Sequence, residues 1–271
     1  MAATKPDQAN LAYAATSERT VLDLYLPPGA TGPVPVVIWV HGGAFRMGDK
    51  SDPQSLDALL GAGFAVVAIN YRLTGTDIWP AQLEDVTAAV AYVHDNAANL
   101  GIDRNRVALF GASAGGFLVA TAGIALAAGP ARAVAAVVDW YGPVQFTTMD
   151  ADIEATGVAR TTGRNDAAGS PESALIGMVV ADNPDAANAV SPLAYIAATD
   201  APLPPFLIMH GALDTYIGAG QSERLRDALL AAPSHSGVSF ELLPEGGHGS
   251  GSFQQAGATD SVIAFLNAHL T

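Results

Sequence analysis

A serine at position 113 lies at the centre of a Gly-x-Ser-x-Gly pattern. An apolar, β-type run over residues 107–110 comes directly before the pattern, and a helix-prone stretch over residues 117–128 follows it. This order predicts a strand, a tight turn and a helix with the serine at the apex, which is the nucleophile elbow. Strand and helix approach so closely in such a turn that Gly111 and Gly115 are expected to be required there. Ser113 is therefore the predicted nucleophile.

A serine hydroxyl needs a general base, and the base needs an acid that orients it. Enzymes built on this elbow place the acid and then the histidine after the serine in the chain, which leaves His235, His248 and His269 as candidates. His235 comes before the last expected strand, residues 238–243, and His269 lies in the final expected helix. His248 directly follows that strand among glycines, which let its imidazole reach Ser113. His248 is therefore the predicted base.

The predicted acid is Asp214, which follows an expected strand at residues 206–210 and so lies at the same sheet edge as the elbow. Other acidic residues fit less well. Asp227 falls within an expected helix, and Glu245 is too close in sequence to His248 for an easy hydrogen bond, although it is the fallback acid.

Acyl transfer also needs donors for the oxyanion of the tetrahedral intermediate. The run His-Gly-Gly-Ala from His41 directly follows an expected strand at residues 35–40, where a loop of the HGGG type belongs. The backbone amides of Gly43 and Ala44 are predicted to act with that of Ala114. His41 is expected to brace this loop by hydrogen bonding. No metal site is predicted, because the chain has no cysteine and no histidine pair with ligand spacing on a helix.

Several large apolar residues flank these loops and are candidates for the wall of a substrate pocket. They are Phe45, Trp140, Tyr141, Tyr216, Ile217 and Phe253. Arg46 and Lys50 lie near the expected oxyanion loop and could attract an acidic substrate, but we expect them to be ordinary surface cations.

Strand and helix patterns alternate along the chain, which predicts an α/β fold with a mostly parallel sheet and helices on both faces. The expected strands cover residues 21–26, 35–40, 64–69, 107–110, 133–138, 206–210 and 238–243. The expected helices cover residues 51–60, 80–98, 117–128, 220–231 and 259–270. Residues 1–20 show no clear pattern. The pattern weakens again from 141 to 205, with short helical pieces near 174–180 and 185–189, and this segment could cover a binding site. We expect one domain over residues 1–271.

Composition limits the possible partners. Half of the residues are hydrophobic and 14% are charged, which favours a folded chain with a large core. A net charge of −14 argues against nucleic acid and anionic membranes as partners. No stretch has transmembrane length, and the polar N-terminus lacks a signal-peptide pattern. We therefore expect a cytoplasmic protein, with export after removal of a signal as the alternative.

With these motifs, the chain resembles the α/β-hydrolase superfamily, in particular the hormone-sensitive-lipase-like carboxylesterases and their small feruloyl and acetyl esterase relatives. The run Asn-Tyr-Arg-Leu at 70–73 and the run Trp-Pro-Ala-Gln-Leu-Glu-Asp at 79–85 are similar to family segments, in which Arg72 and Asp85 are expected to be structural. The chain lacks the long N-terminal helical cap of larger relatives. This implies an open site with a minimal cap, formed mainly by residues 141–200.

The resemblance implies a serine carboxylesterase that forms an acyl-enzyme and needs no cofactor. Short-chain or aryl esters of the feruloyl or acetyl type are the expected substrates, with esterified polysaccharide fragments among the candidates. Two alternatives stay open. An arylformamidase-like amide hydrolase would have a similar His-Gly-Gly loop and triad, and a non-catalytic α/β-hydrolase would only bind a ligand.

Overall fold

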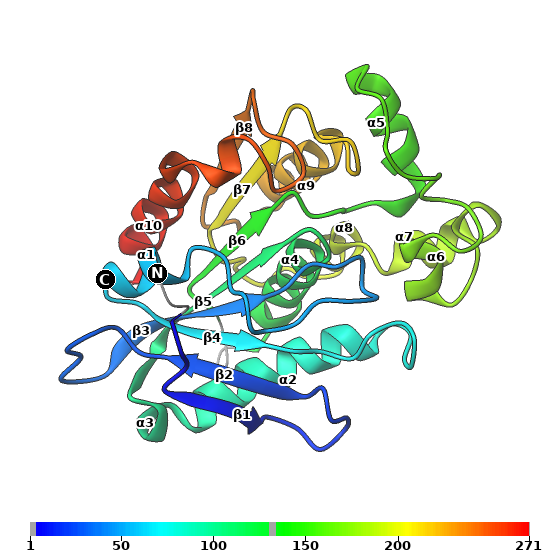
Figure 1. Ribbon diagram of the computed structural model, residues 1–271. Helices are drawn as coiled ribbons and strands as arrows, with labels where there is room; N and C mark the ends of the chain where they lie inside the picture. Colours follow the sequence, from blue (N-terminus) through cyan, green and yellow to red (C-terminus); the bar gives the residue numbers. More distant parts are fainter. Residues whose placement is uncertain (1–3, 130–133, 271) are drawn as a thin grey trace.

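The computed structural model of the chain describes residues 4–129 and 134–270. Ala133, where a strand was predicted to begin, and the first three residues of the polar N-terminus lie outside these ranges. An eight-stranded sheet crosses the molecule in the order β1-β2-β4-β3-β5-β6-β7-β8 (Figure 1). The strands are β1 (Gln8–Ala12), β2 (Val21–Tyr25), β3 (Val34–Val40), β4 (Ala65–Ile69), β5 (Ile102–Ala112), β6 (Ala136–Trp140), β7 (Phe206–Gly211) and β8 (Val238–Leu243). Strand β2 pairs in antiparallel fashion with both β1 and β4, and all other pairs are parallel, so the predicted, mostly parallel sheet is confirmed.

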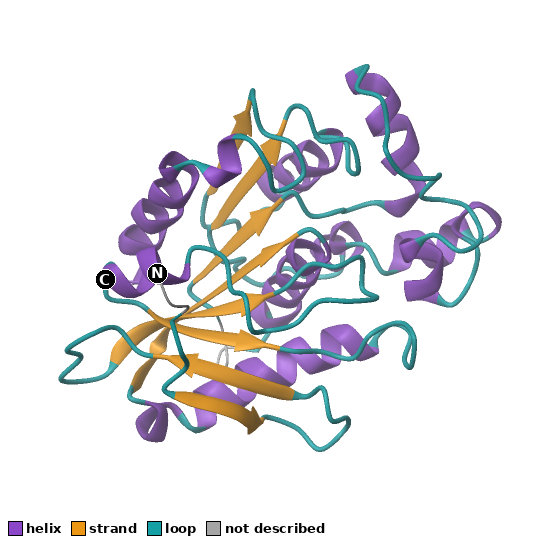
Figure 2. Ribbon diagram, in the orientation of Figure 1, coloured by secondary structure: helices purple, strands orange, loops and turns teal. Residues whose placement is uncertain are grey.

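Helices cover both faces of the sheet, as predicted (Figure 2). One face carries α1 (Leu56–Gly61) and α10 (Ala256–Leu270). The other carries α2 (Ala81–Asp95), α3 (Ala97–Leu100), α4 (Ala114–Ala127), α8 (Pro192–Ala197) and α9 (Gly220–Ala231). Three further helices, α5 (Met149–Thr156), α6 (Pro171–Ile176) and α7 (Pro184–Ala189), lie beyond the carboxyl ends of the central strands (Figure 1).

The centre of the fold is apolar because its elements are covered on every side. The β4 residues are all buried, and β3 is buried from Val36 onwards, as their continuous β-branched runs predict. Helix α4 is buried over its first eleven residues and has no polar face. Even so, within residues 4–129 and 134–270 no helix has the length and apolarity needed to cross a membrane.

The sequence-based boundaries were wrong at several places, mostly in short elements. Strand β1 lies in the N-terminal part that showed no pattern, because this edge strand is largely exposed. The expected helix at 51–60 starts only at Leu56, since the preceding residues form turns. Helix α4 starts three residues earlier than predicted, directly after Ser113. Helices α5 and α8 were missed, because each has eight residues or fewer and shows little periodicity.

Strand order brings the predicted functional residues to one edge of the sheet. Strands β3, β5, β6, β7 and β8 are parallel neighbours, so their carboxyl ends meet at the same edge. His41 follows β3, Ser113 follows β5, Asp214 lies beyond the end of β7, and His248 lies beyond the end of β8.

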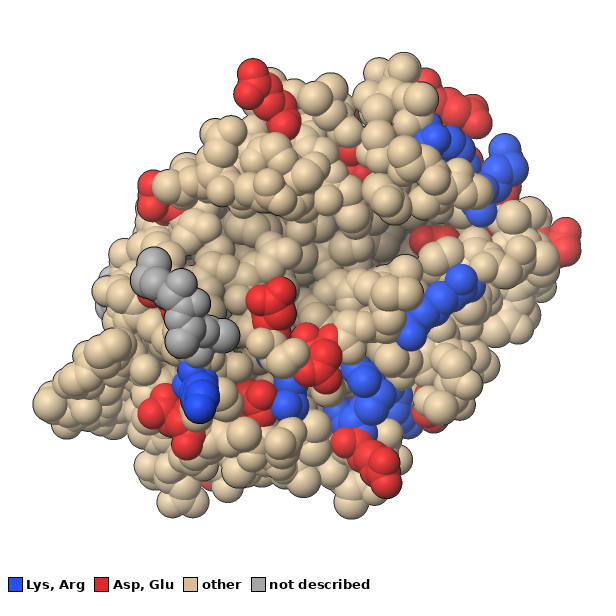
Figure 3. All heavy atoms as spheres, in the orientation of Figure 1, with Lys and Arg blue, Asp and Glu red and all other residues tan. Residues whose placement is uncertain are grey.

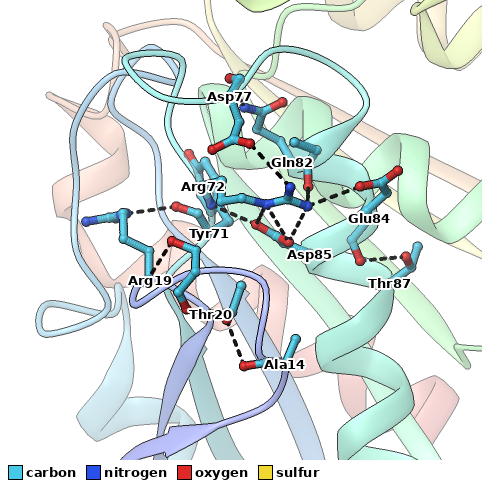
Figure 4. A network of polar contacts seen from close by, with 12 residues as sticks. Ala14, Arg19, Thr20, Tyr71, Arg72, Asp77, Gln82, Glu84, Asp85 and Thr87 are labelled. Carbon is cyan, nitrogen blue, oxygen red and sulfur yellow. Dashed lines mark hydrogen bonds and ion pairs between the residues drawn. The ribbon is translucent and has the colours of Figure 1, made fainter.

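A charged cluster fastens the segment after β4 to helix α2 (Figure 4). The Nε and Nη2 atoms of Arg72 donate to the carboxylate of Asp85 at 2.8 to 3.0 Å, and the backbone amide of Arg72 donates to it at 2.8 Å. Nη2 also donates to the carbonyl of Ala81 and to Glu84, both at 3.1 Å. Asp85 is only 1% exposed, so its charge depends on these donors.

We expect Arg72→Met to lower the free energy of unfolding by about 3 kcal/mol, because it leaves the buried Asp85 carboxylate without its cation. Urea denaturation followed by circular dichroism measures this loss. The control is Arg104→Met, which removes an exposed cation and should change stability by less than about 0.5 kcal/mol. Equal midpoints for the Arg72 variant and the wild type would contradict the expectation.

Candidate active site

Ser113 lies in a strained turn between β5 and α4. Its backbone has φ 57° and ψ −123°, a combination that non-glycine residues rarely adopt. Its amide donates to the carbonyl of Trp140 at 2.8 Å, which ties the turn to the neighbouring strand. A Cβ atom on Gly111 would collide with the carbonyl of Gly115, and one on Gly115 would collide with the carbonyl of Val40. The two glycines are therefore required for close backbone packing, as the sequence predicted.

His248 links the predicted serine and the predicted acid. Its Nε2 lies 2.9 Å from Oγ of Ser113, and its Nδ1 lies 2.8 Å from Oδ2 of Asp214. The rings of Tyr141 and Tyr216 lie against the imidazole, with centroid distances of 4.7 and 5.0 Å. These contacts fix the plane of the ring, so the hydrogen-bonded line Ser113–His248–Asp214 has the geometry of a general-base system.

Asp214 is held in its ionised form by a set of donors. One carboxylate oxygen accepts from the backbone amides of Tyr216 and Ile217 at 2.8 and 2.9 Å, and the other faces His248. Burial by itself would raise the pKa of Asp214, but the hydrogen bond and the charge of His248 outweigh it and hold this pKa below its usual value. A carboxylate at this position can stabilise a positive charge on the imidazole.

His210 lies behind Asp214 and was not predicted as a site residue, since it precedes the acid in the chain. Its Nε2 donates to the carbonyl of Ile217 at 2.9 Å, so its Nδ1 accepts from the hydroxyl of Ser222 at 2.6 Å. Burial lowers the pKa of His210 and keeps the ring neutral. His210 thereby holds the loop that carries Asp214, and the polar residue within the apolar run of β7 was its only sequence signal.

The loop after β3 presents backbone donors beside Ser113. Gly43, Ala44 and Phe45 all have positive φ angles, between 55° and 107°. Within the described residues the amides of Gly43 and Ala44 donate to no protein acceptor. The amide of Ala114, the first residue of α4, likewise has no acceptor within its helix. All three residues line the cavity that contains Ser113, so their amides are free to bind a developing negative charge.

His41 braces this loop from behind. Its Nδ1 donates to the carbonyl of Gly42 at 2.7 Å, and its ring stacks on Tyr71 with a centroid distance of 4.4 Å. Burial lowers the pKa of His41 to about 4, so the ring is neutral at pH 7. A Cβ atom on Gly48 would collide with this ring, which explains the glycine there.

Ser113, His248 and the three predicted oxyanion donors, Gly43, Ala44 and Ala114, line one cavity of about 540 Å³. Figure 3 shows a hollow near the centre of this face, with walls made mostly of residues other than Lys, Arg, Asp and Glu. Four of the six predicted pocket residues line the cavity, namely Phe45, Tyr141, Tyr216 and Ile217. The segment 141–200 contributes further lining residues, namely Pro143, Met149, Thr162, Gly163, Arg164, Asn165, Pro171 and Glu172.

Trp140 does not line this cavity, and its prediction as a pocket residue was wrong. Its ring is 1% exposed and packs on Phe110 and Phe253, and its indole N–H contacts the sulfur of Met209 at 3.0 Å. Side chains alternate along β6, so Trp140 faces α10 on the other side of the sheet. Phe253 lines a second hollow beside Trp140 instead of the Ser113 cavity.

Only one of the two cations near the oxyanion loop differs from expectation. Lys50 is buried and pairs with the Asp23 carboxylate at 2.8 Å, so it is not a surface cation. Arg46 is exposed, but its guanidinium donates to the carbonyls of Gly169 and Ser170, each at 2.6 Å. Arg46 thus joins the loop after β3 to the segment that walls the cavity.

Comparison with known proteins places this geometry among esterases. The BD-FAE family model matches residues 22–229. Esterase LipC of Mycobacterium tuberculosis is 31% identical over 88% of this chain and 59% of its own length. Esterase LipQ of the same organism is 29% identical over 89% of this chain and 56% of its own length. The chain thus spans between half and two thirds of the length of these relatives.

Solved structures agree with the sequence matches. A structure described as a truncated form of a carbohydrate esterase from gut microbiota has a TM-score of 0.83 and 32% identity, covering 97% of this chain and 95% of its own. The thermophilic carboxylesterase EstE1 has a TM-score of 0.75 and 26% identity, covering 92% and 84%. These likenesses confirm the α/β-hydrolase fold and the resemblance to carboxylesterases.

Asp139 lies beneath the elbow and is expected to make the stability of the fold depend on pH. Its Oδ1 accepts from the amide of Gly142 at 3.0 Å, while its Oδ2 has no partner within the described residues. Burial raises the pKa of Asp139 to about 7. The folded chain therefore keeps this proton at pH values where the unfolded chain has lost it. Stability from this group is present below about pH 4 and is lost as the pH rises to about 7.

The variant Asp139→Asn carries no charge at this position. We expect the difference in unfolding free energy, variant minus wild type, to rise by about 2.5 kcal/mol from pH 5 to pH 8. Urea unfolding at both pH values measures this difference. In the control variant Asp227→Asn, where the carboxylate is exposed, the difference should stay flat. A flat difference for the Asp139 variant as well would show that its carboxyl titrates normally.

Proposed function

The chain belongs to the BD-FAE family, and from this we propose that it hydrolyses carboxylic esters through an acyl-enzyme formed on Ser113. One observation carries the proposal: His248 lies within hydrogen-bonding distance of both Ser113 and Asp214, at 2.9 and 2.8 Å. A nucleophile, a base and an orienting acid in this order are what acyl transfer at neutral pH requires.

The first half of the reaction forms the acyl-enzyme. Oγ of Ser113 attacks the ester carbonyl carbon while Nε2 of His248 takes the hydroxyl proton. The carbonyl oxygen becomes an oxyanion, which accepts hydrogen bonds from the amides of Gly43, Ala44 and Ala114. Asp214 stabilises the imidazolium. The tetrahedral intermediate then collapses, the bond to the alcohol oxygen breaks, and His248 gives its proton to the leaving alcohol.

The second half releases the acid. His248 takes a proton from water, and the resulting hydroxide attacks the acyl carbon of Ser113. The same amides hold the second oxyanion. When this intermediate collapses, the bond to Oγ breaks, Ser113 recovers its proton from His248, and the carboxylic acid leaves.

We propose esters with a short or aryl acyl group as the substrate class, including feruloyl and acetyl esters of polysaccharide fragments. The walls contributed by Phe45, Tyr141 and Tyr216 offer apolar and aromatic surface next to Ser113. A volume of about 540 Å³ suits a substrate of this size. The neighbouring structure described as a carbohydrate esterase supports the polysaccharide side of the proposal. The segment 141–200 is the proposed cover of the site within a single domain.

We expect Ser113→Ala to lower kcat for 4-nitrophenyl acetate by about 10⁴-fold or more, and Asp214→Asn to lower it by about 10³-fold or more. The first variant lacks the nucleophile, and the second loses the anion that orients the imidazole. Stopped assays at pH 7.5 measure both losses. The controls are Ser236→Ala and Asp227→Asn, which change exposed residues away from the cavity and should keep the wild-type rate.

Labelling with a fluorophosphonate separates this function from ligand binding without catalysis. The wild type should form one covalent adduct, which peptide mass spectrometry assigns to Ser113, and the Ser113→Ala variant should form none. An unlabelled wild type that also fails to hydrolyse 4-nitrophenyl acetate would contradict the proposed function.

A further inference from the structure

Two buried polar side chains in the cavity wall have atoms without a partner. Oε2 of Glu172 and Nδ2 of Asn165 make no hydrogen bond within the described residues. Each residue is 5% exposed, and both line the cavity that contains Ser113. Burying a polar atom without a hydrogen bond is costly, so such atoms in the wall of a binding cavity indicate that a ligand completes them.

Glu172 is the second residue of α6, and Oε2 of its carboxyl has no hydrogen-bond partner among the described residues. Burial raises the pKa of its carboxyl to about 7, against the opposing effects of its own amide, the Ser170 hydroxyl and the Arg46 charge. The Arg46 guanidinium is occupied by the carbonyls of Gly169 and Ser170. The proposed mechanism does not use this carboxyl, whose Oε2 is a buried acceptor in the cavity wall with no partner among the described residues.

Asn165 is positioned by its backbone, which leaves its side chain unused. The backbone amide of Asn165 donates to Oδ1 of Asp150 at 3.0 Å, and the backbone amide of Asp166 donates to Oδ2 of Asp150 at 3.2 Å. Asp150 in turn forms ion pairs with Arg160 and Arg164. This network fixes the loop of residues 160–166 without the carboxamide of Asn165, whose Nδ2 is a buried side-chain donor with no partner among the described residues.

A free acceptor and a free donor together match one chemical group better than others. An ammonium group would satisfy the ionised Glu172 carboxylate but leave the side-chain amide of Asn165 unpaired, and a carbonyl would satisfy that amide but not the carboxylate. A hydroxyl donates its proton to the carboxyl and accepts from the amide at the same time. Oε2 of Glu172 and Nδ2 of Asn165 expose almost no surface to the cavity. The two side chains therefore have to rotate before a substrate hydroxyl can contact these atoms.

We propose that Glu172 and Asn165 bind a hydroxyl group of the ester substrate and make the enzyme selective for hydroxylated esters. This inference rests on the proposed esterase function and adds two specificity-determining residues to it. A site built to pair a hydroxyl discriminates strongly against an analogue that lacks it, because its polar groups then stay unpaired.

The hydroxyl can belong to the acyl group or to the alcohol, and two substrate pairs distinguish these sources. The acyl pair is methyl 4-hydroxycinnamate and methyl cinnamate. The alcohol pair is 2-hydroxycyclohexyl acetate and cyclohexyl acetate. We expect the wild type to prefer the hydroxylated member by about tenfold or more in kcat/KM within one pair. That pair shows which part of the ester contacts Glu172 and Asn165.

The variants Glu172→Met and Asn165→Leu remove the polar groups but keep the side chains close in size. In each, the preference should fall to about threefold or less, whereas Glu172→Gln, which can still pair a hydroxyl, should keep part of it. The matched control is Glu154→Met on α5, an exposed carboxylate outside the cavity, which should keep the wild-type preference. A wild type without preference in either pair, or variants that keep it, would overturn the inference.

Thermal unfolding separates recognition from a structural role. Replacing an unpaired buried carboxyl by an apolar side chain removes a desolvation cost, so Glu172→Met should melt at or above the wild-type temperature. A lower melting temperature together with an unchanged preference would assign Glu172 to the fold. If the variants keep the preference while the wild type hydrolyses 4-nitrophenyl acetate, only this inference fails. If the wild type hydrolyses no ester, the proposed function fails with it.

Discussion

The close backbone packing of β3, β5 and α4 is the constraint on which the rest of the site depends. At Gly111 and Gly115 main chain meets main chain, and there is no room for a single methyl group. This approach forces Ser113 into its strained conformation, with φ 57°, and starts α4 directly after it. The serine is thereby held at the sheet edge, next to the first amides of a buried helix. The cost of the strained turn is offset by a core that packs α4 on all sides.

Burial and hydrogen-bond partners together determine which titratable groups of the site are charged and which are neutral. Burial lowers the pKa values of His41 and His210, so each ring stays neutral and acts as a fixed hydrogen-bonding brace. Asp214 is enclosed as well, but two backbone amides and His248 keep it ionised. His248 contacts both the buried anion and the cavity. It is thus the residue at which a positive charge can appear and be stabilised during a reaction.

Local patterns predicted the parts of the fold that depend on local rules. A strand, a two-glycine turn and a helix can be identified around Ser113 from residues 107–128 alone, and chain order then selects Asp214 and His248. The sheet face to which a side chain points is harder to predict, because it depends on the register of the strand in the sheet. The sequence could not tell that Trp140 faces α10, whereas its neighbour Tyr141 contacts His248. Lys50 likewise appeared exposed, since its partner Asp23 lies on β2, 27 positions earlier in the chain. The short helices α5 and α8 were missed because tertiary packing and loop contacts stabilise them more than periodicity does.

The same limit explains why the cavity wall escaped sequence analysis. Glu172 and Asn165 lie in a polar segment where an acid or an amide usually indicates a solvated loop. They become notable only because folding buries them without partners. Arg46 gives this wall a link to the proposed oxyanion donors: its backbone follows Phe45, while its guanidinium binds the carbonyls just before α6. A substrate group that fills the wall at Glu172 therefore acts on the same short loop that holds the amides of Gly43 and Ala44. The proposed recognition site and the proposed oxyanion site are thus joined through one arginine, so we expect the two to depend on each other.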